Sequence, residues 1–355
     1  MMSLLIFIFT LGLLIVIHEF GHFITAKASG IKVDVFSIGF GPVLYRKKFQ
    51  SFDFLICAVL WGGYVKLAGF SPEETKGLKS DFLSKPLFIR GLVIAAGPLF
   101  NYILAMFLFI LVFLIGFPVP SSRVGKLVDG YPAVASGIKE GDLILNIDGK
   151  DVKTWEDVSG IIHNTEEGSL ILTVLRAGEK KQFVLHPKRE EKTDIFKKKH
   201  TLSFIGIRPS DEVVKLKYPF FEAVGKGVSS LFGFTWMTLK ALGYVIIGAL
   251  PLRDTFTGPL GIYYVTKQAS HIGVAAVIHL MALLSMSLAV FNLLPLPVLD
   301  GGHIFFLMIE KIRGEPLSSR TEEIISRIGI TFLIILVTLV MYNDVMRFGQ
   351  GLFKK

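Results

Sequence analysis

Two histidines and a glutamate stand close together near the start of the chain, in the stretch HEFGH. His18 and His22 are four residues apart, so a helix would present both imidazoles on one face, and Glu19 follows the first of them. At this spacing two histidines can bind one zinc ion while the glutamate activates a water molecule. The motif therefore predicts a hydrolytic metal site.

The apolar sequence around the motif strengthens this interpretation. Residues 3–26 are otherwise apolar and long enough to cross a bilayer. Ionisable groups inside a membrane helix are costly, so they usually mark a functional site. Core packing could explain one histidine, but two histidines with an acid between them need a common partner. A divalent cation is such a partner.

A third metal ligand has to come from elsewhere, because a catalytic zinc usually takes three protein ligands and keeps one position open. The best source is FNLLPLPVLDGGH, at the end of a later apolar stretch. Pro295 and Pro297 disfavour helix, so the chain should unwind there and deliver Asp300 on a turn. His303 and His279 are competing candidates, for which an interfacial or helix-packing role is the alternative.

The composition of the whole chain indicates a membrane protein that crosses the bilayer several times. Of its 355 residues 52% are hydrophobic and 31 are phenylalanine, and the mean hydropathy is +0.58. The net charge of +9 is also compatible with nucleic-acid binding. We expect no nucleic-acid partner, because no such motif is present and basic loops normally flank membrane spans.

Four stretches are apolar and long enough to cross a bilayer, namely residues 3–26, 91–117, 275–294 and 328–342. A fifth, residues 228–250, is interrupted by a lysine and is expected to lie on the membrane interface, although a crossing stays open. An even number of crossings puts both termini on one side. The first loop carries ten Lys and Arg against five acidic residues, so it should be cytoplasmic and the termini extracytoplasmic.

A hydrophilic insert between the second and third stretches differs abruptly in composition. Residues 121–210 alternate short β patterns with Gly and Asp turns around one helical segment, which predicts a small β-rich domain. The pattern GYPAVASGIKEGDLILNIDGKDV closely resembles a PDZ domain of the bacterial, circularly permuted kind. In that family a strand such as FIGI, residues 204–207, borders a groove where a peptide adds as a strand. A groove that is not used stays possible, because a fold does not fix its function.

HEFGH in a first membrane helix, NLLPLPVLDGG at a later one and a PDZ domain between them resemble the site-2 protease family of intramembrane zinc metalloproteases. The resemblance covers essentially the whole chain and is closest to the bacterial regulator-of-sigma-E protease type, here with a single PDZ domain. It implies that His18, His22 and Asp300 bind Zn²⁺ and that Glu19 is the catalytic base. It also implies that Asn292 lies near the substrate backbone, with an interhelical amide as the alternative.

Two further stretches match features of this family. WGGYVKLAG resembles a membrane-re-entrant β-hairpin that offers its edge to an extended substrate, which makes Gly63, Tyr64, Val65 and Lys66 candidate substrate-binding residues. GPLFN, residues 97–101, matches a small-residue motif that permits close helix packing. Some relatives have two PDZ domains, so size selection by a tandem pair is in doubt here.

The expected architecture is a polytopic α-helical membrane protein with about four transmembrane helices, a re-entrant β-hairpin and an inserted PDZ domain. The expected parts are an N-terminal membrane part, a PDZ domain, a linker with an interfacial amphipathic helix and a C-terminal membrane part, at residues 1–120, 121–210, 211–272 and 273–355.

The resemblance implies a zinc metalloprotease of the bacterial inner membrane, with its PDZ domain extracytoplasmic and its active site near the cytoplasmic side. Its substrates would be transmembrane segments of membrane proteins, such as anti-sigma factors or remnant signal peptides, and a peptide or protein tail would bind the PDZ groove. Two alternatives stay open. One is a catalytically idle membrane scaffold, and the other is a membrane-anchored zinc peptidase that acts on soluble peptides.

Overall fold

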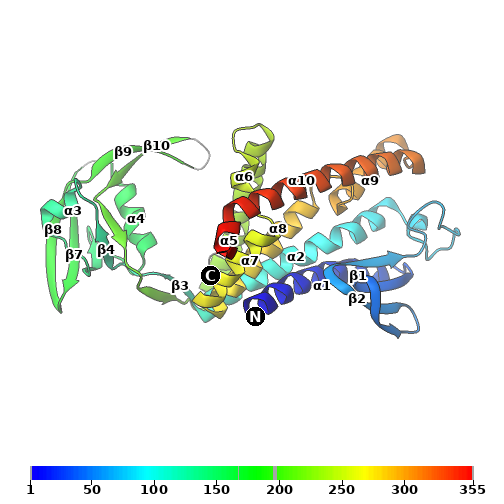
Figure 1. Cartoon of the computed structure of the whole chain (residues 1–355), viewed down its shortest axis with the longest axis horizontal. Coiled ribbons are helices and arrows are strands. Elements are labelled where there is room, and N and C mark those ends of the chain that lie inside the picture. The colour runs from blue at the N-terminus through cyan, green and yellow to red at the C-terminus, as the bar shows by residue number, and fades with distance from the viewer. Residues whose placement is uncertain (1, 167, 195–197, 354–355) are drawn as a thin grey trace. The chain divides into compact units, whose positions relative to one another are not determined.

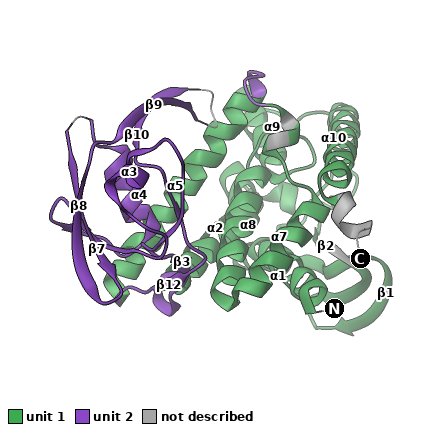
Figure 2. Ribbon diagram, turned by 60° about the vertical axis from the view of Figure 1, so that its left-hand side comes forward, with its two compact units in different colours: residues 1–112, 220–245, 251–355 green, residues 113–219, 246–250 purple. Residues whose placement is uncertain are grey.

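The computed structural model describes residues 2–166, 168–194 and 198–353, and it divides into two compact units. The first, which we call the membrane unit, comprises Met1–Val112, Phe220–Val245 and Pro251–Lys355. The second, the β unit, comprises Phe113–Pro219 and Ile246–Leu250 (Figure 2).

Four long helices dominate the membrane unit. They are α1 (Met2–Ala28), α2 (Leu87–Ile115), α8 (Val274–Asn292) and α10 (Ser319–Phe353) (Figure 1). Among the described residues these four helices are long and apolar enough to cross a membrane. Each covers all or most of one of the four stretches that the sequence predicts to span a bilayer, so the prediction of four candidate membrane spans is confirmed.

The remaining helical segments of this unit are shorter or more polar. They are η1 (Phe82–Ser84), α5 (Phe220–Ile246), α6 (Leu252–Thr255), α7 (Pro259–Ile272) and α9 (Asp300–Arg313). Helix α5 packs on α2, because the Tyr102 hydroxyl lies 3.0 Å from the Thr235 hydroxyl and a Cβ on Gly227 would lie 2.8 Å from the backbone nitrogen of Ile110. The interfacial position expected for residues 228–250 stays a prediction.

A two-stranded antiparallel hairpin follows α1. Its strands are β1 (Val33–Lys48) and β2 (Asp53–Leu67), with Ile38 opposite Gly63 and several register shifts along the pair. Within the described chain no strand other than β1 pairs with β2. Residues 63–67 of β2 each have a partner on one side only, so their outer edge is not covered by a strand. The hairpin expected from WGGYVKLAG is therefore present, and its insertion into the membrane stays a prediction.

Helices α1 and α2 approach closely because small residues stand where they cross. A Cβ on Gly21 would lie 2.4 Å from the carbonyl oxygen of Ala96, a distance that no larger side chain permits. Apolar residues near the end of α1 and the start of α2, among them Ala26, Val93 and Ile94, form a buried cluster with the hairpin. The crossing of two membrane helices thus fixes which residues of α2 face the histidines of α1.

The β unit consists of short strands around one apolar core. A four-stranded sheet has the order β6-β5-β7-β8, and three further strand pairs are β9-β10, β4-β11 and β3-β12. The strands are β3 (Phe117–Pro120), β4 (Val124–Leu127), β5 (Leu143–Ile147), β6 (Lys150–Asp151), β7 (Leu170–Arg176), β8 (Glu179–Leu185), β9 (Lys188–Thr193), β10 (Lys199–Phe204), β11 (Ile207–Pro209) and β12 (Val213–Leu216). The helices are α3 (Pro132–Ser136) and α4 (Trp155–His163).

Helix α4 begins where the sequence places a capping box. Thr154 accepts from the backbone N–H of Asp157, and the Asp157 carboxylate accepts from the backbone N–H of Thr154. The helix buries Val158 and Ile162 against strand residues such as Ile144 and Leu172. The prediction of a small β-rich domain between the second and third spans is confirmed. Its assignment as a PDZ domain with bounds 121–210 stays a prediction.

Candidate metal centre

Helix α1 presents His18 and His22 side by side on one face. Their rings meet edge to face with centroids 4.9 Å apart, and their Nε2 atoms are 3.2 Å apart. This is the arrangement that a spacing of four residues produces on a helix. Both side chains are largely buried, with 12% and 13% of their surfaces exposed.

Asp300 reaches the same place from the opposite end of the sequence. The chain leaves α8 at Asn292 and enters α9 at Asp300, so it is non-helical over the two prolines, as expected. Val298 has a positive φ of 85°, and a Cβ on Gly301 would lie 2.2 Å from the carbonyl oxygen of Leu294. The glycine therefore lets the first turn of α9 pack directly on the preceding backbone.

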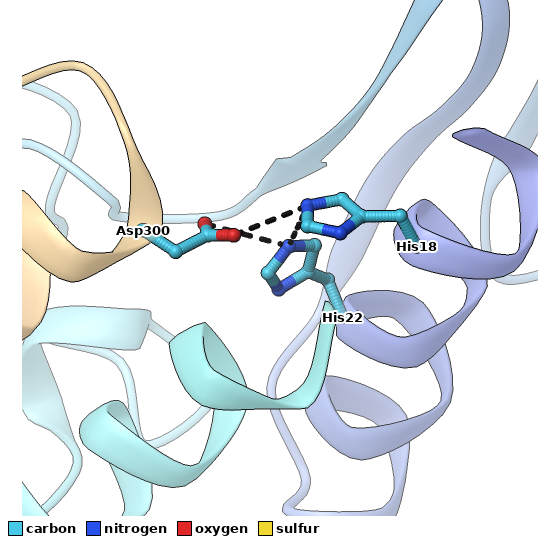
Figure 3. A group of neighbouring side chains, drawn as sticks. All are labelled: His18, His22 and Asp300. Carbon is cyan, nitrogen blue, oxygen red and sulfur yellow. Dashed lines mark hydrogen bonds and ion pairs between the residues drawn. The ribbon is translucent and has the colours of Figure 1, made fainter. Parts of the chain in front are cut away.

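The three side chains form one cluster with the spacing of a metal site (Figure 3). Asp300 Oδ2 lies 3.1 Å from His18 Nε2, and Asp300 Oδ1 lies 3.5 Å from His22 Nε2. Zinc bonds of about 2.0–2.2 Å at tetrahedral angles put neighbouring ligand atoms roughly 3.3–3.6 Å apart. Two nitrogens and one carboxylate at these separations fit a zinc ion with one position left open.

Helix α2 orients both imidazoles through their other nitrogens. His22 Nδ1 lies 2.9 Å from the carbonyl oxygen of Val93, to which an Nδ1–H can donate. His18 Nδ1 lies 3.3 Å from Asn101 Nδ2, and turning this amide over would present its oxygen to an Nδ1–H in the same way. In that tautomer each Nε2 carries the lone pair that a metal needs, and it points at Asp300.

Gly97 provides the space in which the two rings lie. A Cβ at this position would be 2.2 Å from His22 Nε2 and 2.9 Å from His18 Cε1. The sequence motif GPLFN predicted only close helix packing, and its contact with the histidines through Gly97 and Asn101 was missed. The motif itself was the available signal, but it does not show which helix faces it.

A cavity of about 280 Å³ adjoins the cluster and brings together most of the predicted site residues. Its walls include the three clustered side chains together with Glu19, Asn292, Gly63, Tyr64, Val65, Phe70 and His303. A Cβ on Gly63 would lie 3.1 Å from Glu19 Cγ, so the glycine lets strand β2 approach the glutamate. Strand β2 and Glu19 therefore form adjoining parts of the cavity wall.

The other candidates lie outside the cluster of three. Lys66 does not line the cavity, and its Nζ lies 3.2 Å from Glu74 Oε1. His303 lines the cavity, with its ring 5.6 Å from that of Phe70. His279 packs between aromatic rings, with its centroid 5.5 Å from that of Phe109, as the helix-packing alternative expected.

Comparison with known proteins places this geometry in context. The model of peptidase family M50 matches residues 6–336. A protein of Agrobacterium fabrum that carries the name of a zinc metalloprotease is 34% identical, over 96% of this chain and 94% of its own. The regulator of sigma-W protease RasP of Bacillus subtilis is 28% identical over 97% of this chain and 98% of its own. A protein of Enterococcus faecalis named as the protease Eep is 30% identical over 98% of this chain and its full length.

Proposed function

Because the chain belongs to peptidase family M50 and is a zinc metalloprotease, we propose that it hydrolyses peptide bonds within the transmembrane segments of other membrane proteins. The observation that carries this proposal is the cluster of His18, His22 and Asp300 beside Glu19, in a unit with four candidate membrane spans. A hydrolytic site among membrane helices can reach peptide bonds that soluble proteases cannot.

We assign the zinc ligands to His18 Nε2, His22 Nε2 and one carboxylate oxygen of Asp300. Their mutual distances and the contacts of the two Nδ1 atoms support this assignment. A zinc ion held by these three side chains would supply a Lewis acid for activating water and for polarising the scissile carbonyl.

Glu19 moves the proton in this mechanism. It takes a proton from the attacking water and returns it to the leaving amine, which is the role of a general base and then a general acid. Its position in the cavity, one residue after His18, supports this role. The carboxylate does not need to leave the cavity between the two steps.

The substrate has to unwind before it can be cut, since the peptide groups of a membrane helix are paired within the helix. We propose that the outer edge of β2 pairs with the unwound segment through the backbone of Gly63, Tyr64, Val65 and Lys66. Lys66 can take part in this way although its side chain pairs with Glu74. Asn292 lines the same cavity and offers an amide to the freed backbone.

The name of RasP suggests the substrate class. That relative is called a regulator of sigma-W protease, and we propose anti-sigma factors as substrates of this chain, with remnant signal peptides as the second candidate. The proposed location is the bacterial inner membrane, with both termini and the β unit extracytoplasmic. The basic first loop would then be cytoplasmic and would place the metal cluster near that side.

We also propose that the β unit is a PDZ domain that holds an extended peptide or protein tail. A groove of about 310 Å³ runs between α4 and residues 204–208, with Trp155, Val158 and Ile162 on the helix side. This is where the family pattern places the peptide. The groove would select or orient substrates that the membrane unit then cuts.

The test is cleavage in proteoliposomes of a protein with one transmembrane segment, compared with a soluble peptide of the same sequence. Glu19→Gln should keep zinc and abolish cleavage of the membrane substrate. Glu315→Gln, which changes an exposed glutamate that pairs with Arg313, is the matched control and should cut normally. Normal cleavage by the Glu19 variant would remove its catalytic role. Preferential cleavage of the soluble peptide would favour the peptidase alternative, and intact function without zinc would favour the scaffold.

A further inference from the structure

Away from the metal cluster, a two-bond ion pair joins the start of α2 to the third turn of α9. Arg90 Nη1 donates to Glu310 Oε2 at 3.0 Å, and Arg90 Nη2 donates to Glu310 Oε1 at 2.5 Å. The side chains are 8% and 15% exposed, so both charges are largely withdrawn from solvent. The two residues are 220 positions apart, and neither lines the cavity.

The Arg90 guanidinium is also tied to its own segment. Its Nε donates to the carbonyl oxygen of Lys85 at 3.2 Å, just before α2 begins. Three of its donors are therefore fixed in one plane, two of them on Glu310. This forked geometry defines the direction as well as the distance of the bound carboxylate.

Helix α9 runs antiparallel along the first turns of α2. At one end Glu310 meets Arg90, and in the middle Leu307 Cδ1 lies 3.9 Å from where a Cβ on Gly91 would be. At the other end Asp300 lies beside His22, whose Nδ1 contacts the carbonyl oxygen of Val93. The ion pair and the metal ligand thus stand at opposite ends of one helix contact, about 15 Å apart for ten residues of helix.

The contacts between these ends are mainly apolar and do not set the register by themselves. Ile304 and Leu307 pack against the buried cluster that contains Val93 and Ile94. Such contacts are not directional, so a small slide or rotation of α9 would cost them little. The same slide would move Asp300 away from the lone pairs of His18 and His22. The close packing of Gly301 on the Leu294 backbone holds the start of α9, and the Arg90 pair adds a directional contact at its other end.

We propose that Arg90 and Glu310 are positioning residues that fix α9 on α2 and thereby hold Asp300 at the two histidines. This inference rests on the proposed assignment of Asp300 as a zinc ligand. It gives the ion pair a role in metal affinity, at a distance from the metal, beyond its contribution to folding.

The experiment measures the zinc dissociation constant of the full-length protein in detergent by competition with a chromogenic chelator. Arg90→Gln and Glu310→Gln should each weaken zinc binding by about 10- to 100-fold, the range for residues that support metal ligands. Arg90→Lys keeps the charge but loses the fork, so it should lie between these variants and the wild type. The exchanged pair, Arg90→Glu with Glu310→Arg, should recover most of the affinity.

Two further variants serve as references. Arg46→Gln removes an exposed ion pair with Asp53 in the same unit and should leave zinc binding unchanged. Asp300→Ala removes the proposed ligand itself and should lower zinc affinity more than any variant of the pair. Thermal unfolding of the zinc-free proteins reports the structural contribution of the pair separately.

Weakened zinc binding that the exchanged pair restores supports the inference. Wild-type zinc affinity in Arg90→Gln overturns it, even if the melting temperature falls, because the pair would then be structural only. Weakened binding that the exchanged pair does not restore assigns the effect to packing and also overturns it. If Asp300→Ala keeps wild-type zinc affinity, the ligand assignment in the proposed function fails, and the inference that rests on it fails too.

Discussion

Two aspartates, one in each unit, are paired in opposite ways. In the β unit the side chain of Asp142 is 1% exposed and accepts three bonds, from Arg176 Nε at 2.7 Å, from Arg176 Nη2 at 2.7 Å and from the backbone N–H of Lys139 at 2.9 Å. In the membrane unit Asp300 is 18% exposed and faces two imidazole nitrogens at 3.1 and 3.5 Å.

Asp142 and Asp300 differ in which group supplies the positive charge that neutralises the carboxylate. The guanidinium of Arg176 neutralises Asp142 from within the chain, so that pair is complete and structural. The Val93 carbonyl orients the imidazole of His22, and His18 Nδ1 contacts the amide of Asn101. With both Nδ1 atoms protonated, each Nε2 directs a lone pair at the Asp300 carboxylate. Three groups with facing lone pairs repel one another unless a metal ion or a proton lies between them. The comparison thus separates a folded ion pair from a site for a ligand.

Removing the Asp300 carboxylate should have the largest effect. Loss of a residue that hydrogen-bonds to a metal ligand can weaken metal binding by about 100-fold. Asp300→Ala removes a proposed ligand itself, so it should weaken zinc binding by more than this and should abolish proteolysis. Elemental analysis after dialysis and a cleavage assay measure the two effects. The zinc-free variant should melt no lower than the zinc-free wild type, because the imidazoles lose no donor that the chain supplies. Undiminished zinc content would move the third ligand to another residue.

Removing the Asp142 carboxylate should instead destabilise the β unit and leave zinc binding unchanged. Asp142→Ala leaves Arg176 without its partner, and we expect a loss of about 2 kcal/mol. This is below the about 3–5 kcal/mol of a fully buried pair, because Arg176 keeps some contact with solvent. Urea unfolding followed by Trp155 fluorescence measures it. Glu179→Ala, which removes an exposed pair with Lys181, is the control. A loss of zinc in Asp142→Ala would contradict the separation of the two roles.

The sequence predicted the three clustered side chains because their signals are local. His18 and His22 share a helix face by their spacing alone, and Pro295 and Pro297 marked the break before Asp300. The four spans followed from length and apolar composition, which the helices of the membrane unit match. Each of these inferences uses only neighbours in the chain.

The supporting residues could not be found in the same way. Gly97 and Asn101 contact the histidines only because α2 crosses α1 at that point. A membrane helix that is apolar on all sides gives no sign of which side faces a partner. Arg90 and Glu310 are 220 residues apart, and as single charges near basic loops they look like ordinary surface residues. Tertiary packing alone joins them.

The stability that the Asp142–Arg176 pair contributes should fall in acid, whereas that of a neutral polar contact should not. Burial by itself would raise the pKa of Asp142, but the hydrogen bonds from Arg176 and from the Lys139 backbone hold the pKa below its ordinary value. A lowered folded pKa means that the stabilisation is full above the unfolded pKa of about 3.9 and is lost as the pH falls toward the folded pKa. Urea unfolding from pH 6 to pH 3 should therefore show falling stability, and Asp142→Asn should flatten that part of the curve. An unchanged slope in the variant would assign acid sensitivity to other carboxylates.

A third carboxylate, Asp344, is bound by the chain but faces no full positive charge. Its replacement should cause the smallest loss of stability. Its side chain in α10 is 1% exposed and accepts from the backbone N–H groups of Gly258 and Gly261 at 3.1 and 2.9 Å, at the start of α7. These donors carry only the partial charge of a helix N-terminus. Asp344→Asn keeps one acceptor oxygen and removes the charge, so we expect a loss of about 1 kcal/mol.

Zinc binding should not change in this variant, because Asp344 is satisfied by the chain as Asp142 is. Chemical unfolding of the zinc-free protein and chelator competition measure the two quantities. A variant that loses as much stability as Asp142→Ala would mean that helix N–H groups neutralise a buried charge as fully as a guanidinium does. A variant that loses zinc would mean that α7 helps to set the metal centre. Either result would mean that the role of a carboxylate depends on which helices it joins. It would then not depend on whether the chain itself supplies all of its hydrogen-bond donors.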